Sequence, residues 1–380
     1  MMLEATAATR RPLRVAHVVH GLEVGGLEKQ VIETVRRADG RIVQPQIICT
    51  DYVGRLADDI SRSTSVSAIN ARPGFDWRAI LRLAVLLRRS RIDIIHSHNE
   101  RSHFLSTLAG RLARIPVHIN TRHGVYPPTT RRGAIRRRAM GRSSDLVVAV
   151  SRVARDVTVE RDQIPSAKVR IINNGTDVNA PQLTRSEARR RLNLKNEFFV
   201  IGAAGRLAPE KDYATLIDAF AQAQADIPNV AGVILGDGEL AGALAQAART
   251  RGCQSLRFCG YRPDAASLLA GFDVFIQPSL TEGISNSVLE AMATGLPVIA
   301  TAVDGNIEAI GDDGAGLLVP PRDARALATA IATLAREPEQ RARLGAAARQ
   351  RATAHFSIEA TARAYEALYV ELAHRKGLKI

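Results

Sequence analysis

Short apolar runs alternate with amphipathic segments along the first half of the chain. The run Leu13–Val19 has the length and composition of a buried strand, and Leu27, Val31 and Val35 follow it at helical spacing. The alternation continues through the strand-like runs QPQIICT, IDIIHSH, PVHINTRHG, DLVVAVS and KVRIINNG and the helical segments AILRLAVLLRR and FLSTLAGRLA. Strands that alternate with helices predict a parallel, doubly wound sheet.

The pattern restarts after the polar stretch that ends near residue 181. The helical segments TRSEARRRLNL, DYATLIDAFAQAQ and ELAGALAQAAR alternate with FFVIGAAG, VAGVILGDG, LRFCGY, VFIQPS and PVIAT, which we expect to complete the strand set. The fold class is therefore α/β, with two Rossmann-like domains at residues 1–180 and 181–357. A final helix within 358–380 is expected to pack back on the first domain. Because ligands bind beyond the C-terminal ends of parallel strands, we expect a cleft between two facing domains.

The segment Pro278–Ile299 carries the most specific chemistry. Glu282 and Glu290 stand eight positions apart around a Gly-Ile-Ser-Asn-Ser turn that is expected to open a helix. Eight positions can place two carboxylates on one helix face roughly 12 Å apart, which is the reach of a nucleotide-sugar. The free N–H groups of the turn suit a phosphate. The alternative is a strand, a loop and a solvated helix with two incidental acids.

Composition narrows the class of protein. An apolar content of 46% with 24% charged residues is ordinary for a globular protein. The three cysteines show no metal-ligand spacing and no disulfide framework, which favours a reducing cytoplasm. We expect neither a membrane span nor export, because no apolar run approaches the required length and the start lacks a signal-peptide core.

The excess of basic over acidic residues is confined to the first half of the chain. Residues 1–180 hold 30 Lys and Arg against 16 Asp and Glu, while residues 181–380 hold 22 of each. The run Thr130–Arg142 is so dense that Arg136, Arg137 and Arg138 are not expected all to pair internally. Three interpretations compete: an anionic membrane surface or lipid-phosphate acceptor, an arginine-rich composition without function, and nucleic acid. The first is favoured, because each basic residue near anionic lipid is worth about 1 kcal/mol. Nucleic acid is not expected, since no binding motif or aromatic platform accompanies the charge.

Six motifs in order along the chain resemble the retaining glycosyltransferases of family 4, which have the GT-B fold. The acidic segment with Glu282 and Glu290 matches that family's donor-binding motif. The other motifs are VGGLEKQ at Val24–Gln30, TRHG at Thr121–Gly124, INNGTD at Ile172–Asp177, GRLAPEKD at Gly205–Asp212 and GDGEL at Gly236–Leu240. The order and spacing of these motifs resemble those of the family over nearly the whole chain.

Two cations stand where the leaving diphosphate of a nucleotide-sugar would need positive charge. Arg206 and Lys211 both project from one loop between a strand and a helix, where arginine can bind phosphate bidentately and lysine acts as a mobile point charge. The resemblance assigns them to the donor diphosphate. The alternative is an ordinary pair of loop cations beside Glu210. Gly25 and Gly26, also between a strand and a helix, allow close approach of a ligand, with a simple turn as the alternative. The resemblance places the donor phosphate and the acceptor there.

The resemblance assigns the remaining donor contacts. His123 would contact the donor sugar, Glu282 the sugar hydroxyls and Glu290 the ribose, and catalysis would rest on His123, Arg206, Lys211 and Glu282. The residues expected to line the sugar, phosphate and base are Gly236, Asp237, Tyr261, Arg262, Gly283, Ile284, Ser285 and Asn286.

The sequence departs from the family pattern at two places. Gly305-Asn306 replaces the commoner Gly-Gly, and Ile284-Ser285-Asn286 replaces a commoner start with Phe. These departures leave the donor sugar open. The GISNS variant resembles a subgroup associated with bacterial exopolysaccharide assembly.

Histidines outside the donor motifs are interpreted as structural or acceptor-side. His96 and His98 are expected to point to opposite faces of their strand, and with no third ligand of suitable spacing we expect no metal. No cofactor is expected beyond the donor substrate.

The function expected is transfer of a sugar from a nucleotide-diphosphate sugar to a lipid-linked or saccharide acceptor. The enzyme would be cytoplasmic and peripheral at the inner face of the plasma membrane. Two alternatives stay open: a nucleotide-sugar epimerase of the same fold, and a non-catalytic module that binds sugar or polyanion.

Overall fold

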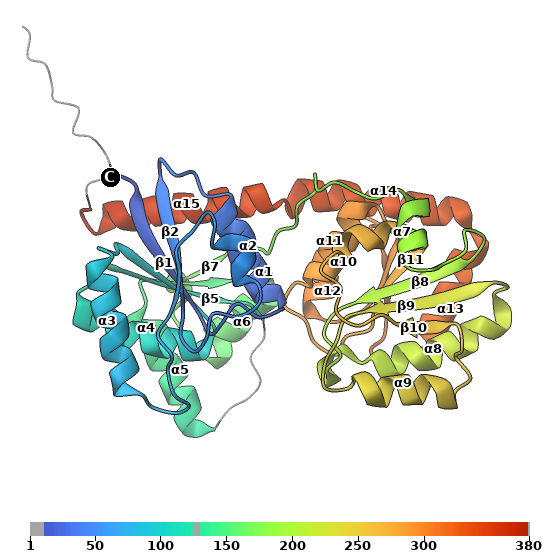
Figure 1. Ribbon diagram of the computed structural model, residues 1–380, viewed down its shortest axis with the longest axis horizontal. Helices are drawn as coiled ribbons and strands as arrows, with labels where there is room; N and C mark the ends of the chain where they lie inside the picture. Colours follow the sequence, from blue (N-terminus) through green and yellow to red (C-terminus); the bar gives the residue numbers. More distant parts are fainter. Residues whose placement is uncertain (1–10, 125–129, 379–380) are drawn as a thin grey trace, which may run out of the picture. The chain divides into compact units, whose positions relative to one another are not determined.

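The computed structural model describes residues 11–124 and 130–378, and the chain forms two compact units (Figure 1). Unit 1 comprises residues 1–173 and 359–380, and unit 2 comprises residues 174–358. Each unit is one parallel sheet with helices on both faces. The expected α/β class with two doubly wound sheets is therefore confirmed.

Unit 1 contains a seven-stranded sheet in the order β3-β2-β1-β4-β5-β6-β7. Its strands are β1 Leu13–Val19, β2 Val43–Cys49, β3 Val66–Ala68, β4 Ile94–His98, β5 Val117–Arg122, β6 Leu146–Ala149 and β7 Val169–Ile171. Its helices are α1 Gly26–Arg36, α2 Ala57–Ile60, α3 Trp77–Arg89, α4 Glu100–Ala113, α5 Arg131–Ser143, α6 Arg152–Asp156 and α15 Ile358–Arg375. The short strand β3 and the helices α2, α5 and α6 were not expected from the sequence.

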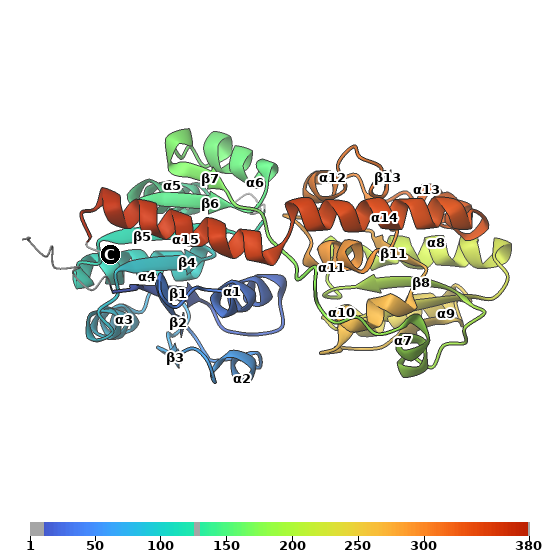
Figure 2. The same cartoon turned by 90° about the horizontal axis from the view of Figure 1, so that it is seen from above.

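The strands of unit 1 are apolar on both sides because both faces of the sheet are covered. Ala16 and Val18 of β1 pack with α3 and α4, whereas Val15 packs with the last helix, α15. Figure 1 shows α15 on one side of this sheet and α3, α4 and α5 on the other, and Figure 2 shows α15 lying along the strands. Tyr365 and Tyr369 of α15 are buried against that face.

Unit 2 contains a six-stranded sheet in the order β10-β9-β8-β11-β12-β13. Its strands are β8 Phe199–Ala204, β9 Val230–Leu235, β10 Leu256–Phe258, β11 Val274–Gln277, β12 Val298–Thr301 and β13 Leu317–Val319. Its helices are α7 Arg185–Arg191, α8 Tyr213–Asp226, α9 Ala241–Thr250, α10 Ala265–Leu268, α11 Asn286–Thr294, α12 Asp304–Ile310, α13 Ala324–Arg336 and α14 Pro338–His355. The expected strand set was incomplete, because β13 adds a three-residue strand beyond β12. The helices α10, α12, α13 and α14 were also not expected from the sequence.

The strand order of unit 2 reverses between β8 and β11. The chain runs outward from β8 to β9 and β10 on one side, then returns to β11, β12 and β13 on the other. Loops at such a reversal diverge and leave a crevice beyond the C-terminal ends of the strands, where open α/β sheets bind ligands. The loops after β8 and β11 carry Lys211 and Glu282, two of the candidate site residues.

Candidate functional site

An ion pair lies across the reversal point of unit 2. Lys211 ends a one-turn 3-10 helix, Pro209–Lys211, and its Nζ lies 2.5 Å from Oε1 of Glu282 in the loop after β11. The same Oε1 accepts hydrogen bonds from Gln277 Nε2 at 2.8 Å and Ser279 Oγ at 2.6 Å. Three donors on one oxygen fix the orientation of the carboxylate.

The two loops that carry this ion pair are also tied through their backbones. The N–H of Leu280 donates to the carbonyl oxygen of Glu210 at 2.8 Å. The side chains of Lys211 and Glu282 keep 18% and 9% of their surface exposed. The pair is therefore a partly enclosed, preorganised arrangement of charge, with the ammonium group still within reach of a ligand from solvent.

Arg206 lies on the same loop as Lys211, as expected, but it is far more exposed. Its side chain is 68% exposed and its Nη2 lies 2.5 Å from Oε1 of Glu210. An exposed ion pair of this kind is weak, so Arg206 can leave Glu210 for an anionic ligand. The two cations thus have different carboxylate partners, which the sequence did not indicate.

The Gly283–Asn286 turn leads into α11, as expected. The N–H groups of the first turn of α11 begin at Asn286, and Ser285 precedes them without a side-chain cap hydrogen bond. Ile284 is buried, and its carbonyl oxygen accepts a hydrogen bond from Asn174 Nδ2 at 3.2 Å. Asn174 therefore positions the turn.

The placement of the two glutamates corrects one expectation. Glu282 lies in the loop before α11, and Glu290 lies within that helix. They do not share a helix face, because the helix begins only at Asn286, four residues after Glu282. The prediction of a turn followed by a helix is confirmed, whereas the prediction that both carboxylates lie on one helix face is wrong.

Close backbone packing surrounds the same edge of the sheet. A Cβ on Gly236 would lie 1.9 Å from the carbonyl oxygen of Gly205, and Gly236 has φ +142°, so only glycine fits there. The N–H of Gly236 donates to the carbonyl oxygen of Gly260 at 2.8 Å. Next to it, Tyr261 is 36% exposed, while Arg262 donates two 2.9 Å hydrogen bonds to Asp264. The positions expected to contact the base thus lie on closely packed neighbouring loops.

In unit 1, Gly25 and Gly26 occupy the start of α1. Gly25 is the N-cap residue in an extended conformation with φ −155°, and Gly26 is the first residue of the helix. A Cβ on Gly25 would meet the carboxylate of Glu28 at 2.2 Å. That contact is with the end of a flexible side chain, so close packing alone does not require glycine here.

His123 follows β5, is partly buried, and stands at the end of a chain of imidazoles that continues through the buried His98 and His17. His123 Nε2 lies 2.9 Å from His98 Nδ1, and His98 Nε2 lies 3.2 Å from His17 Nδ1. Burial lowers the pKa of His123 to about 3 and that of His17 to about 4, so both rings are neutral near pH 7. His123 Nδ1 has no hydrogen-bond partner among the described residues.

His96 and His98 do not point to opposite faces of β4. Residues two apart on a strand share a face, and the two ring centroids lie 4.3 Å apart. His96 contacts the hydroxyl groups of Tyr369 at 2.6 Å and Thr121 at 2.7 Å. His96 is thus held within the layer between β4, β5 and α15.

A third histidine, His17 of β1, lies beside His96 and His98, and sequence spacing did not reveal it. His17 is paired in register with His96 across neighbouring strands, and ring nitrogens of His17, His96 and His98 lie within 4.8 Å of one another. Neutral imidazoles in such a group have the chemistry to hold zinc or copper. Here they contact one another and the side chains of Thr121, His123 and Tyr369.

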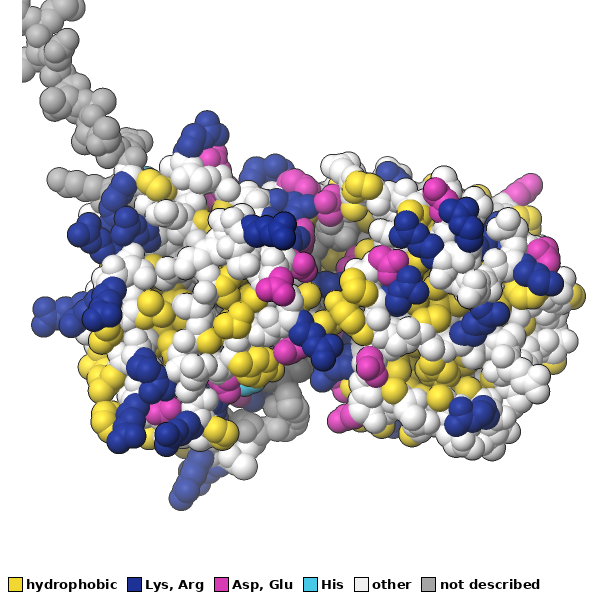
Figure 3. Space-filling view, in the orientation of Figure 1, with side chains coloured by type: hydrophobic (Ala, Val, Ile, Leu, Met, Phe, Trp, Pro, Cys, Tyr) yellow, Lys and Arg dark blue, Asp and Glu magenta, His cyan; other side chains and the backbone are white. Residues whose placement is uncertain are grey.

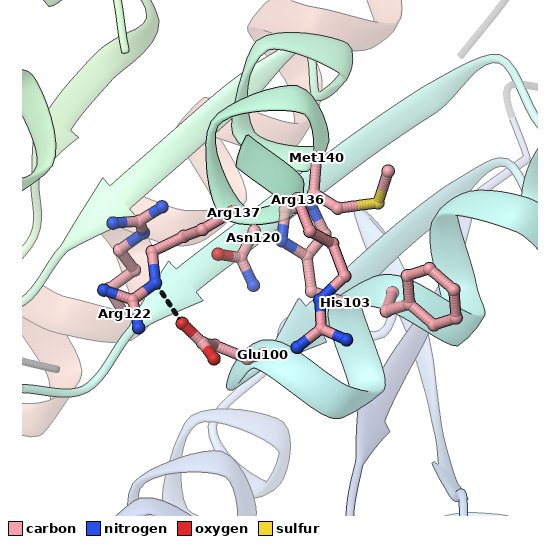
Figure 4. A pocket seen from close by; sticks show the side chains of 8 residues that line it. Glu100, His103, Asn120, Arg122, Arg136, Arg137 and Met140 are labelled. Carbon is pink, nitrogen blue, oxygen red and sulfur yellow. Dashed lines mark ion pairs between the residues drawn. The ribbon is translucent and has the colours of Figure 1, made fainter. Parts of the chain in front are cut away.

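The arginine run forms α5, and its arginines differ in environment. Arg137 is buried and forms ion pairs with Glu100 and Asp162, whereas Arg136 is exposed. Figure 4 shows the Glu100–Arg137 pair at the edge of a small pocket. The pocket is lined by Glu100, His103, Phe104, Asn120, Arg122, Arg136, Arg137 and Met140.

Three residues of the candidate site were missed in the sequence. Gln277 and Ser279 hold Glu282, and Asn174 holds the turn before α11. Gln277 and Ser279 flank Pro278 at the end of β11, and their position at a strand end was the available signal. Asn174 lies inside the INNGTD motif, where sequence alone gave it no role.

Two family models match the chain, one on each unit. The model described as Glycosyltransferase Family 4 matches residues 24–180, and the model described as Glycosyl transferases group 1 matches residues 184–351. A D-inositol 3-phosphate glycosyltransferase of Kribbella flavida is 30% identical over 330 residues, covering 77% of this chain and 74% of that protein. The chain belongs to glycosyltransferase family 4.

Other similar proteins share most of their length with this chain. The UDP-Gal:alpha-D-GlcNAc-diphosphoundecaprenol alpha-1,3-galactosyltransferase of Escherichia coli is 26% identical over 337 residues, covering 83% of this chain and 86% of that protein. The crystal structure of Anabaena Alr3699/HepE with UDP and glucose has a TM-score of 0.85 at 20% identity, covering 94% of this chain and all of that one. These likenesses confirm the GT-B fold expected from the sequence.

Proposed function

We propose that this protein is a retaining glycosyltransferase that moves a sugar from a nucleotide-diphosphate sugar to a lipid-linked or saccharide acceptor. The reaction would serve synthesis of bacterial exopolysaccharide or another cell-envelope glycan, on the cytoplasmic side of the plasma membrane. The observation that carries the proposal is the Lys211–Glu282 pair, held by Gln277 and Ser279 at the reversal point of the unit 2 sheet. It offers a cation and a fixed carboxylate at one place.

The proposed chemistry uses those two charges differently. As the bond from the anomeric carbon to the diphosphate breaks, negative charge grows on the leaving group, and Lys211 with Arg206 stabilises it. Glu282 accepts hydrogen bonds from sugar hydroxyls and Glu290 from the ribose. The acceptor hydroxyl attacks from the face that the diphosphate leaves, and a departing phosphate oxygen takes its proton, which retains the anomeric configuration.

Other positions complete the proposed donor contacts. Gly236, Tyr261 and Arg262 lie beside the base, and the backbone of Gly283–Asn286 lines the sugar and phosphate. In unit 1, His123 contacts the donor sugar, and the loop with Gly25 and Gly26 faces phosphate and acceptor. The neutral state of His123 supports hydrogen bonding to a hydroxyl rather than pairing with the diphosphate.

A uridine nucleotide is the first donor class to test. The Escherichia coli relative is named for UDP-Gal, and the Anabaena structure was determined with UDP and glucose. We propose that the reaction needs no metal ion, because Lys211 and Arg206 supply the positive charge that a divalent ion would otherwise supply.

The test is a thermal-shift panel of UDP-, GDP- and ADP-sugars, with chelator and then with divalent metal. One nucleotide class should raise the Tm without metal. If the folded protein responds to none of them, with or without metal, the donor site proposed here is wrong.

Product analysis tests the reaction itself. The anomeric proton coupling in the NMR spectrum of the transfer product should show the configuration of the donor. Inverted configuration would exclude the retaining mechanism, and conversion of donor alone to an epimer would show the alternative reaction.

A further inference from the structure

Helix α3 in unit 1 carries an apolar stripe on its solvent side. Trp77, Leu81 and Val85 are 56%, 47% and 48% exposed and stand four residues apart, so they line one side of the helix. The opposite side already packs into unit 1 through Ala79, Ile80, Leu83, Ala84 and Leu87. The core of unit 1 therefore does not use the exposed stripe.

The apolar surface continues beyond α3. Phe75, just before the helix, is 70% exposed and contacts Phe104 of α4 edge to face, with ring centroids 6.3 Å apart. The guanidinium of Arg136 on α5 lies 5.7 Å from the Phe104 ring centroid. Figure 3 shows hydrophobic and basic side chains side by side over this part of unit 1. Three consecutive helices thus contribute to one mixed surface.

Arginines border this stripe. Helix α3 contains Arg78, Arg82, Arg88 and Arg89, and helix α5 contains six arginines; neither helix contains an acidic residue. Arg78 lies 5.4 Å from the Trp77 ring centroid, and Arg82 donates to the carbonyl oxygen of Ile69 at 2.9 Å. These contacts hold cationic groups beside the apolar side chains.

We propose that the surface formed by Phe75, Trp77, Leu81 and Val85, with the exposed arginines of α3 and α5, docks on an anionic bilayer. We call it the α3 surface. Aromatic and aliphatic side chains enter the interface between headgroups and acyl chains, and arginines attract anionic headgroups. This inference rests on the proposed function and deepens it, since it gives the surface through which an acceptor held in the membrane is reached.

Charge favours a membrane over a second copy of the chain. A two-fold interface through the α3 surface would bring each set of arginines toward its copy, and neither α3 nor α5 offers a carboxylate to pair with them. Anionic lipid supplies both the negative charge and the apolar phase. None of the helices in the described part of the chain has the length and apolar character of a membrane span.

Vesicle co-sedimentation of the full chain tests the proposal. Wild-type protein should bind vesicles that contain phosphatidylglycerol much better than vesicles of phosphatidylcholine alone. The triple variant Trp77→Ser, Leu81→Ser and Val85→Ser should bind the anionic vesicles at least about tenfold less, because three apolar side chains no longer partition. The matched control, Ile307→Ser with Leu318→Ser, changes two exposed apolar residues of unit 2 and should bind like wild type.

Three results would overturn the proposal. One is equal binding of the triple variant and wild type, and another is no preference of wild type for anionic vesicles. The third is a wild-type protein that is a dimer in light scattering and a triple variant that is a monomer, with equal vesicle binding of the two. That result would assign the α3 surface to contact with a second copy of the chain. The donor-induced Tm shift should be the same in wild type and triple variant. Its absence in both, with vesicle binding intact, would contradict the proposed function and not the docking surface.

Discussion

At the scale of single residues, Lys211 is the side chain whose loss should matter most. Replacing Lys211 with alanine removes the cation proposed to stabilise the leaving diphosphate, so kcat should fall by about 10²- to 10³-fold. Glu282 would keep two hydrogen-bond donors but lose its counter-ion, which should lower the free energy of unfolding by about 1–3 kcal/mol. Steady-state kinetics and chemical denaturation measure the two effects separately.

The control for this prediction is Lys195→Ala. The Lys195 side chain is 71% exposed and its Nζ lies 3.9 Å from Glu197, so the change should leave both kcat and stability near wild type. Near-normal turnover of the Lys211 variant would show that Lys211 does not stabilise the leaving group.

Sequence predicted individual site residues better than their contacts. Lys211 and Glu282 were both identified, but each was assigned to a different part of the donor, and their direct ion pair was not foreseen. His17 was missed because its partners, His96 and His98, lie on β4, and only the pairing of β1 with β4 brings them together. Contacts between distant segments depend on strand order and register, which local spacing does not determine.

At the scale of elements, α12 supports the donor loop through a glycine. A Cβ on Gly305 would lie 1.3 Å from the carbonyl oxygen of Gly283, so Gly305→Ala must displace the Gly283–Ile284 backbone. We expect a loss of about 1–3 kcal/mol in the free energy of unfolding. The donor-induced Tm shift should fall as well, because the displaced turn lines the proposed donor site.

Gly242→Ala is the matched control. Gly242 is also the second residue of its helix, α9, and nothing lies within 4 Å of the added Cβ. Alanine should therefore be neutral or stabilising by up to about 1 kcal/mol. If both alanine variants behave alike in denaturation and donor binding, the close contact at Gly305 matters neither for stability nor for binding of the donor.

The elements found from sequence share a physical cause. Central strands of a covered parallel sheet are continuous apolar runs, and β1, β4, β8 and β9 were clear for that reason. Helix α5 was missed because six of its thirteen residues are arginine and one of its two buried residues, Arg137, is itself charged. Strands β3 and β13, with three residues each, are too short for a periodic signal.

At the scale of the whole molecule, acid should weaken unit 1 before unit 2. Unit 1 contains the buried histidines His17, His96, His98 and His103. Burial lowers the pKa of His17 to about 4, so the unfolded chain binds protons that the folded chain does not as pH falls below about 6.5. Stability is therefore full above that pH and declines towards pH 4, and His17 alone should cost about 1 kcal/mol near pH 5.5.

Limited proteolysis with mass spectrometry at near-neutral and mildly acidic pH measures this difference. Cleavage should increase first in unit 1, while His355→Gln in unit 2 should leave the pattern unchanged. Earlier loss of protection in unit 2 would contradict the assignment of acid sensitivity to the buried imidazoles.

Trp77 is the one tryptophan in the chain, and it is more than half exposed. Intrinsic emission excited at the red edge of the protein absorption band therefore comes from a single site on α3. Transfer of that indole from water to an apolar phase shifts its emission to shorter wavelength. Under the proposed docking, the emission maximum of unlabelled protein therefore changes when the protein binds a lipid surface. The molecule thus contains a built-in optical probe at one known position, which allows encounter with vesicles to be followed in stopped-flow time without dye or tag.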